Sequence, residues 1–201
     1  MCVKVIVTRE SPLELPWLEV SLKLVWNDYK VLTLVLAPFQ QWGLDFIGKF
    51  KDNSSNGYCW ILTATDYFTK WVEAIPTKKA TDKVVMDFIE SNIITRFGAP
   101  TKITTDNAKA FSSAEFTSFC FNYGIILSHS SNYYPQGNGL AESSNKNLMT
   151  ILKKTIGNNK KSWDGKIKYA LWANRINKKS ATEKTPFELV YGLTVSLPIY
   201  L

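Results

Sequence analysis

The chain has 201 residues, of which 45% are hydrophobic and 13% aromatic, so it can bury a core and wholesale disorder is excluded. Lysine and arginine outnumber aspartate and glutamate by 24 to 17, and the formal net charge of +7 favours an anionic partner. The 3 cysteines are widely spaced and there is 1 histidine, His129, so neither a disulfide framework nor a structural zinc site within this chain is expected. His129 is expected to be a hydrogen-bonded loop residue.

No segment has the pattern of a membrane span or of a signal peptide. The longest apolar run, Val31 to Phe39, is too short to cross a bilayer and contains Thr33 and Pro38. The first ten residues lack the ordered charged, apolar and cleavage regions of a signal peptide. We therefore expect no contact with a membrane and a reducing compartment, the nucleus or the cytoplasm.

The first part of the chain divides into an extension and a set of strands. Residues 1–37 show no sustained period, and we expect a poorly specified N-terminal extension there. From Pro38 the pattern of hydrophobic residues is regular enough to predict individual strands. Strands are predicted at Trp42–Phe50, Tyr58–Asp66 and Trp71–Pro76, and the short turns between them predict an antiparallel meander.

The hydrophobic period then becomes helical. Helices are predicted from the N-cap Thr81 to about Gly98, at Ser113–Tyr123, from about Leu140 to Ile156 and at Trp163–Ile176. Short strands are predicted at Thr101–Asp106 and Ile125–Ser128. Strands that are followed by alternating strands and helices favour one α/β domain with a mixed sheet, covering residues 38–201.

Three carboxylates stand on three of these elements. Asp45 lies within the first strand, Asp106 ends the fourth, and Glu142 opens the long helix, with 35 residues between the last two. Strand ends of α/β sheets often present ligands, and oxygen ligands suit Mg²⁺ or Mn²⁺. Taken singly, each acid has a second interpretation: Asp106 as a turn or cap residue, and Glu142 as a surface charge favoured by the helix dipole.

Basic residues gather near this group of acids. Between residues 144 and 184 there are eleven lysines and arginines and two acids, a net charge of +9, whereas the rest of the chain carries −2. On the long helix, Lys146, Met149 and Lys153 fall near the side of Glu142. The predicted buried stripe lies opposite and consists of Leu148, Ile151, Leu152 and Ile156. Any single lysine could lie on a solvated face, but the cluster predicts a surface for a phosphate backbone.

From about Pro38 to Tyr200 the chain resembles the catalytic core of retroviral-type integrases, specifically those of gypsy-class LTR retrotransposons. The matching segments are QWGLDFIG, DYFTKWVEAIP, FIESNIITRFGAP, TDNAKAF, YYPQGNGLAESSNK and TPFELVYG. The interval from Asp106 to Glu142 matches the family's D,D-35-E signature. The resemblance implies an RNase H-like fold, with a five-stranded mixed sheet flanked by helices. It also implies that Asp45, Asp106 and Glu142 are catalytic and bind two Mg²⁺ or Mn²⁺ ions.

The implied activity is metal-dependent 3′-end processing of DNA followed by DNA strand transfer, in a protein that forms homo-oligomers. Tyr133, Tyr134 and Gln136 fall in the family's loop beside the site. With Asn107, Lys146 and Lys153 they are the expected DNA-contacting residues. Two alternatives stay open: a non-catalytic nucleic-acid-binding remnant of a retrotransposon polyprotein, and an RNase H-like nuclease that only hydrolyses.

Two departures from the family bear on whether this chain is active. The family's N-terminal zinc module and its C-terminal DNA- or chromatin-binding domain have no counterpart in these 201 residues, so we expect a truncated core. Where the family has Asp-Asn-Gly, this chain has Asp106-Asn107-Ala108. If that glycine needs a positive φ, alanine would strain the turn by roughly 1–2 kcal/mol and loosen Asp106. We would then expect Ala108→Gly to raise activity.

Overall fold

The computed structural model describes residues 37–130, 139–157 and 159–195 of the chain, with only the backbone described for Gly139 and Leu140. The extension predicted at residues 1–37 therefore lies almost wholly outside the described residues, as do Tyr133, Tyr134 and Gln136.

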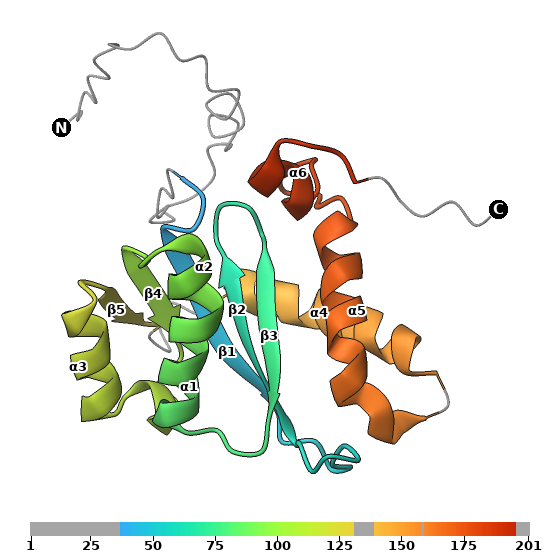
Figure 1. Cartoon of the computed structure of the whole chain (residues 1–201), viewed down its shortest axis with the longest axis horizontal. Coiled ribbons are helices and arrows are strands. Elements are labelled where there is room, and N and C mark those ends of the chain that lie inside the picture. The colour runs from blue at the N-terminus through green and yellow to red at the C-terminus, as the bar shows by residue number, and fades with distance from the viewer. Residues whose placement is uncertain (1–36, 131–138, 158, 196–201) are drawn as a thin grey trace, which may run out of the picture. The chain divides into compact units, whose positions relative to one another are not determined.

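A five-stranded mixed sheet forms the centre of the fold (Figure 1), in the strand order β3-β2-β1-β4-β5. The strands are β1 (Gln41–Gly48), β2 (Trp60–Asp66), β3 (Val72–Thr77), β4 (Lys102–Thr105) and β5 (Ile126–His129). The first three form the predicted antiparallel meander, and β4 and β5 add to β1 in parallel. The predicted strands are thus confirmed, with ends that shift by at most two residues.

The helices of the first half of the chain are α1 (Asp82–Ile89), η1 (Glu90–Ile94), α2 (Thr95–Phe97), η2 (Lys109–Phe111) and α3 (Ala114–Asn122). Thr81 caps α1 as predicted, because its hydroxyl accepts a hydrogen bond from the Val84 backbone N–H. The helix predicted from there to Gly98 is continuous, but its middle turn, η1, is a π-helix. An apolar period does not distinguish one wide turn from the α-helical turns around it.

The second half contains α4 (Gly139–Ile156), η4 (Lys160–Ser162), α5 (Trp163–Ile176) and α6 (Pro186–Tyr191). Helix α6 was not predicted, although the sequence contains the signals for it. Thr185 and Glu188 form a capping box, Pro186 occupies the first turn, and Gly192 ends the helix with a φ of 70°.

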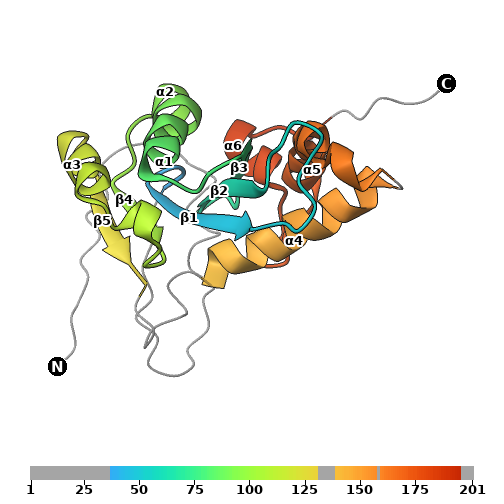
Figure 2. The ribbon, with the colours of Figure 1, turned by 90° about the horizontal axis from the view of Figure 1, so that it is seen from below.

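Helices cover both faces of the sheet, with α1 to α3 on one face and α4 and α5 on the other (Figure 2). Each face has its own hydrophobic core, since neighbouring strand residues point to opposite sides. The first core includes Trp42, Leu44, Leu62, Phe88, Ile103, Phe111 and Phe116. The second includes Ile61, Val72, Leu148, Leu152, Trp163 and Ile167. Because Leu44 and Phe46 pack into the first core, Asp45 between them faces the side of α4.

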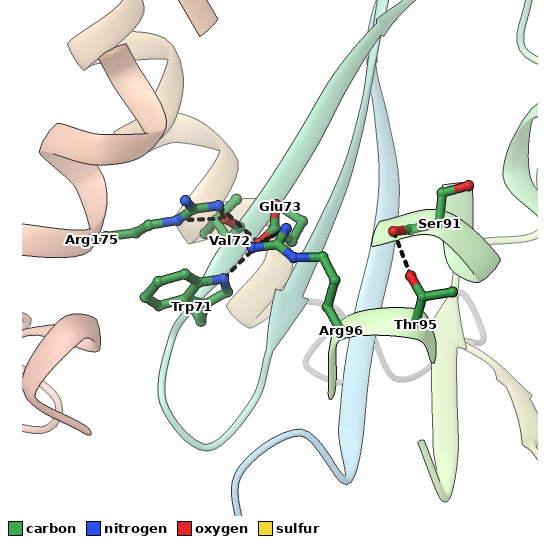
Figure 3. Close-up of polar contacts among 7 residues, drawn as sticks. All are labelled: Trp71, Val72, Glu73, Ser91, Thr95, Arg96 and Arg175. Carbon is green, nitrogen blue, oxygen red and sulfur yellow. Dashed lines mark hydrogen bonds and ion pairs between the residues drawn. The ribbon is translucent and has the colours of Figure 1, made fainter. Parts of the chain in front are cut away.

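A buried charge cluster ties the edge strand β3 to helices on both faces (Figure 3). Glu73 on β3 is 3% exposed, and its Oε1 accepts from Arg96 at 2.7 Å, Arg175 at 2.9 Å and the Trp71 indole N–H at 2.8 Å. Arg175 also donates from two of its nitrogens to the Val72 carbonyl oxygen and stacks on the Trp71 ring. Arg96 comes from α2 and Arg175 from α5, so one carboxylate holds three elements together.

In the part of the chain that the structure describes, every helix is too short or too polar to cross a bilayer.

Candidate active site

Asp45 lies on the central strand β1 and is held by partners from two other elements. Asn145 on α4 donates from Nδ2 to Asp45 Oδ2 at 2.7 Å. The Thr63 hydroxyl on β2 lies 3.0 Å from Asn145 Oδ1 and 3.1 Å from the Asp45 carbonyl oxygen. Asn145 is 7% exposed and Thr63 is 1% exposed, so their hydrogen bonds are shielded from water. Together these hydrogen bonds fix both the backbone and the carboxylate of Asp45.

Asn145 was not among the predicted site residues, although its position in the sequence carried a signal. Ala141, Leu148 and Leu152 form the buried stripe of α4, and Asn145 stands in the same stripe at helical spacing. A polar residue within an apolar stripe needs a buried partner, since an unsatisfied amide there is costly. That partner is Asp45.

Asp106, predicted as the last residue of its strand, follows β4 directly, in a turn without backbone strain. Its Oδ1 accepts a hydrogen bond from the Ala108 backbone N–H at 3.0 Å. Ala108 has a φ of −61° and a ψ of 145°, which any L-residue adopts readily. The expectation that alanine strains this turn is therefore wrong, and with it the expected gain from Ala108→Gly.

The charges of the three acids act on one another. The pKa of Asp45 is raised to about 6, first by burial, then by the negative charge of Asp106 and less strongly by that of Glu142. Hydrogen bonds from the Phe46 backbone and from Asn145 oppose this rise in the pKa. Glu142 is exposed in the first turn of α4. Within the described ranges, however, no three His, Cys, Asp or Glu side chains are grouped closely enough to hold a metal ion as they stand.

Comparisons with known proteins agree with this arrangement. A family model described as the Integrase core domain matches residues 36–135. The chain is 31% identical over 157 residues to the Gag-Pol polyprotein of Avian reticuloendotheliosis virus, an alignment that covers 78% of the chain and 13% of the polyprotein. It thus spans only a small part of that relative's length.

Two solved structures extend the comparison. The simian T-cell lymphotropic virus intasome, in complex with PP2A regulatory subunit B56 gamma, contains a chain that is 28% identical, with a TM-score of 0.68, covering 82% of this chain and 58% of that one. The HTLV-2 integrase catalytic core domain in complex with magnesium, in its dimeric form, is 30% identical, with a TM-score of 0.60, covering 77% of this chain and 97% of that domain. The chain belongs to the retroviral-type integrase core family. The predicted RNase H-like fold is thereby confirmed.

The ligand atoms and the negative charge of the three acids of this integrase core suit a hard divalent cation. Their ligand atoms are all carboxylate oxygens, which Mg²⁺ and Mn²⁺ prefer. Burial is the largest cause of the raised pKa of Asp45, and repulsion by Asp106 and, less strongly, Glu142 adds to it; a bound cation would relieve that repulsion. Asp106 keeps Oδ2 available, since its one side-chain hydrogen bond within the described residues is made by Oδ1. The three side chains would have to draw together around an ion, and Glu142 is exposed and thus free to turn.

The expected DNA-contacting residues of the core are only partly described. Lys146 and Lys153 are exposed on α4, on the helix that carries Glu142. Asn107 is exposed beside Asp106. Tyr133, Tyr134 and Gln136 lie outside the described residues. Asp66, at the end of β2, caps a turn: it accepts hydrogen bonds from the Phe39 and Thr69 backbone N–H groups.

Proposed function

We propose that residues 38–201 form the catalytic core of a gypsy-class retrotransposon integrase, which processes DNA 3′ ends and transfers them to target DNA. The observation that carries the proposal is the site at Asp45. A half-buried carboxylate is braced by Asn145 and Thr63, and its pKa is raised first by burial and then by the charges of Asp106 and, less strongly, Glu142. Nothing in the packing of the sheet requires three mutually repelling acids there, whereas a cation site does.

Each residue has a separate part in the proposed reaction. Asp45 supplies a carboxylate that cannot turn away, because Asn145 holds it. Asp106 offers Oδ2 from a turn that Ala108 holds, and Glu142 supplies the third carboxylate from α4. Two Mg²⁺ or Mn²⁺ ions bound by these groups would activate the attacking oxygen and stabilise the leaving oxygen during in-line displacement at phosphorus.

The attacking oxygen is that of water in 3′-end processing, which breaks a P–O bond and leaves a free DNA 3′-hydroxyl. In strand transfer this hydroxyl attacks a target phosphodiester, forms a new P–O bond and releases the target 3′-hydroxyl. No covalent bond to the protein is formed at either step.

A strand-transfer assay tests the proposal directly. The chain is incubated with a labelled double-stranded DNA end, a target plasmid and Mg²⁺ or Mn²⁺, and joined products are counted. Joining that depends on the metal supports the proposal. Metal-dependent cleavage without joining would favour the RNase H-like nuclease, and DNA binding without either reaction would favour the non-catalytic remnant.

Replacing Asn145 with leucine should weaken metal binding by about 10–100-fold, the usual effect of losing a group that orients a metal ligand. Leucine is apolar like its buried neighbours Ala141 and Leu148, but it leaves Asp45 Oδ2 without its donor, so the free energy of unfolding should also fall by about 1–3 kcal/mol and binding is measured well below the melting temperature. Titration calorimetry with Mn²⁺ measures the affinity. Asn147→Leu, at an exposed position of the same helix, is the control and should bind Mn²⁺ as the parent does. Equal affinity in both variants would show that Asn145 has no part in the site.

The lysines of α4 should bind DNA phosphates. Replacing Lys146 and Lys153 together with glutamate should weaken binding to all DNA sequences alike and reduce the slope of log K against log salt by about 2, since each lost phosphate contact removes about 0.9. Filter-binding titrations at several salt concentrations measure this slope. The pair Lys79→Glu and Lys83→Glu makes the same change in net charge in the exposed turn and helix after β3. If both pairs of substitutions weakened DNA binding equally, the effect would come from the overall charge, and Lys146 and Lys153 would have no specific contact with the phosphates.

We also propose that the core forms homo-oligomers in the nucleus or the cytoplasm. The HTLV-2 catalytic core domain has been solved in a dimeric form, which supports self-association here. Cys59 and Cys120 are both free and buried, which supports a reducing compartment.

A further inference from the structure

We propose that His129 is a positioning residue of the candidate active site, which acts through the backbone of Asp106. This inference rests on the proposed function only for its consequence, which is tighter metal binding. Its geometry stands on three polar atoms at the ends of the paired strands β4 and β5: the Thr105 hydroxyl, the His129 Nδ1 and the Asp106 carbonyl oxygen.

The three atoms form a closed triangle. The Thr105 hydroxyl donates to the Asp106 carbonyl oxygen at 2.9 Å. His129 Nδ1 lies 3.0 Å from the Thr105 hydroxyl oxygen and 3.3 Å from the Asp106 carbonyl oxygen. Thr105 is fully buried, so its hydroxyl has no access to water and depends on these partners.

The directions of these hydrogen bonds select one tautomer of His129. The Asp106 carbonyl oxygen can only accept, so its 3.3 Å contact with His129 Nδ1 is a hydrogen bond only in the tautomer that carries the proton on Nδ1. We assign this tautomer to His129. In it, the Thr105 hydroxyl oxygen accepts from Nδ1 while its own proton is donated to the Asp106 carbonyl oxygen. The ring donates into the triangle from the side of β5.

The strand pairing holds the histidine in place. Thr105 and His129 are partners in the parallel register of β4 and β5. The next residue, Ser130, donates from its backbone N–H to the Thr105 carbonyl oxygen at 2.8 Å and from its hydroxyl to the same oxygen at 3.2 Å. The end of β5 is thus fastened to β4 immediately before Asp106.

Fixing the Asp106 backbone also fixes its carboxylate. The side chain is held at Oδ1 by the Ala108 N–H, which belongs to the same short turn. With its carbonyl oxygen held on one side and Oδ1 on the other, the residue presents Oδ2 in one direction. A carboxylate that is already oriented loses less conformational freedom when a cation binds, so binding is tighter.

Three substitutions separate hydrogen bonding from packing. His129→Asn keeps a donor at the position of Nδ1 but loses the ring. His129→Phe keeps the ring but loses the donor, and His129→Gln places its amide nearer the position of Nε2. Two quantities are measured: the exchange rate of the Ala108 amide hydrogen by NMR without metal, and the dissociation constant for Mn²⁺ by calorimetry.

We expect His129→Phe and His129→Gln to raise both quantities by about 2-fold to 10-fold, the size of one net hydrogen bond, and His129→Asn to stay within about 2-fold of the parent. The reverse order, with phenylalanine harmless and asparagine impaired, would overturn the inference and assign His129 a packing role. Equal values in all variants would also overturn it. If the parent binds no Mn²⁺ but amide exchange follows the expected order, the proposed function fails while the positioning of Asp106 by His129 stands.

Discussion

Replacing Glu73 with leucine is expected to lower the free energy of unfolding by about 3–5 kcal/mol, because it leaves a buried charge without its partner. Glu73 is 3% exposed and accepts from Arg96, Arg175 and Trp71 (Figure 3). Most of the loss should come from Arg175, whose side chain is 19% exposed and stacks on the Trp71 ring. The Arg96 side chain is 40% exposed and can turn toward the solvent, so its ion pair with Glu73 contributes less to stability.

Urea unfolding of single and double variants measures the loss. Arg175→Met should cost more stability than Arg96→Met, and adding Arg175→Met to Glu73→Leu should recover part of the loss, since an apolar pair can replace a buried ion pair. Losses below about 1 kcal/mol for Glu73→Leu, or equal losses for the two arginine variants, would contradict the assignment of Glu73 as the group that joins β3 to α2 and α5.

Replacing Asp106 with asparagine is expected to reduce strand transfer by more than about 100-fold, because losing even an outer group that orients a metal ligand costs about 10–100-fold. The fold should persist, since asparagine keeps an oxygen that can accept from the Ala108 N–H as Oδ1 does. Joined DNA products measure the activity, and the melting temperature without metal serves as the control. Asn107→Asp, which shifts the carboxylate by one residue on the same turn, should not restore activity in the Asp106→Asn background.

An Asp106→Asn variant that joins DNA at the parental rate would show that Asp106 is not a ligand. A variant that loses activity together with stability would show only that the turn is needed for folding. The expected pattern, lost activity in a fold of unchanged stability, separates these outcomes.

Much of the fold follows from local sequence patterns. The three strands of the meander and the helices α3 and α4 have clear periods, and Thr81 and Ser113 cap their helices through the hydrogen bonds that their residue types predict. The π-helical turn η1 could not be predicted, since the apolar period continues through it. Helix α6 was missed because it is short, although its capping box was readable.

The sequence was enough to propose the acids of the candidate site, but not the residues that support them. Asp45, Asp106 and Glu142 are proposed from their spacing and from the resemblance to integrases, and their role stays a prediction. The contact of Asn145 with Asp45 joins positions 100 residues apart, and a residue's type does not show which distant side chain it will meet. The same holds for His129, expected in a loop but found at the end of β5, with Nδ1 beside the Asp106 carbonyl oxygen 23 residues away. The error at Ala108 arose from assuming a backbone angle that this turn does not use.

The measurement that tests the central claim most directly is a crystal structure of the chain soaked with Mn²⁺, with anomalous scattering used to find the ion. The account predicts a manganese peak bound by Asp45 and by Oδ2 of Asp106, with the Glu142 carboxylate turned toward a second peak or toward the same ion. Ligand distances should be near those of Mg²⁺, about 2.0–2.1 Å. A well-ordered site with no manganese peak near Asp45 and Asp106 would contradict the account, as would a peak held only by other residues.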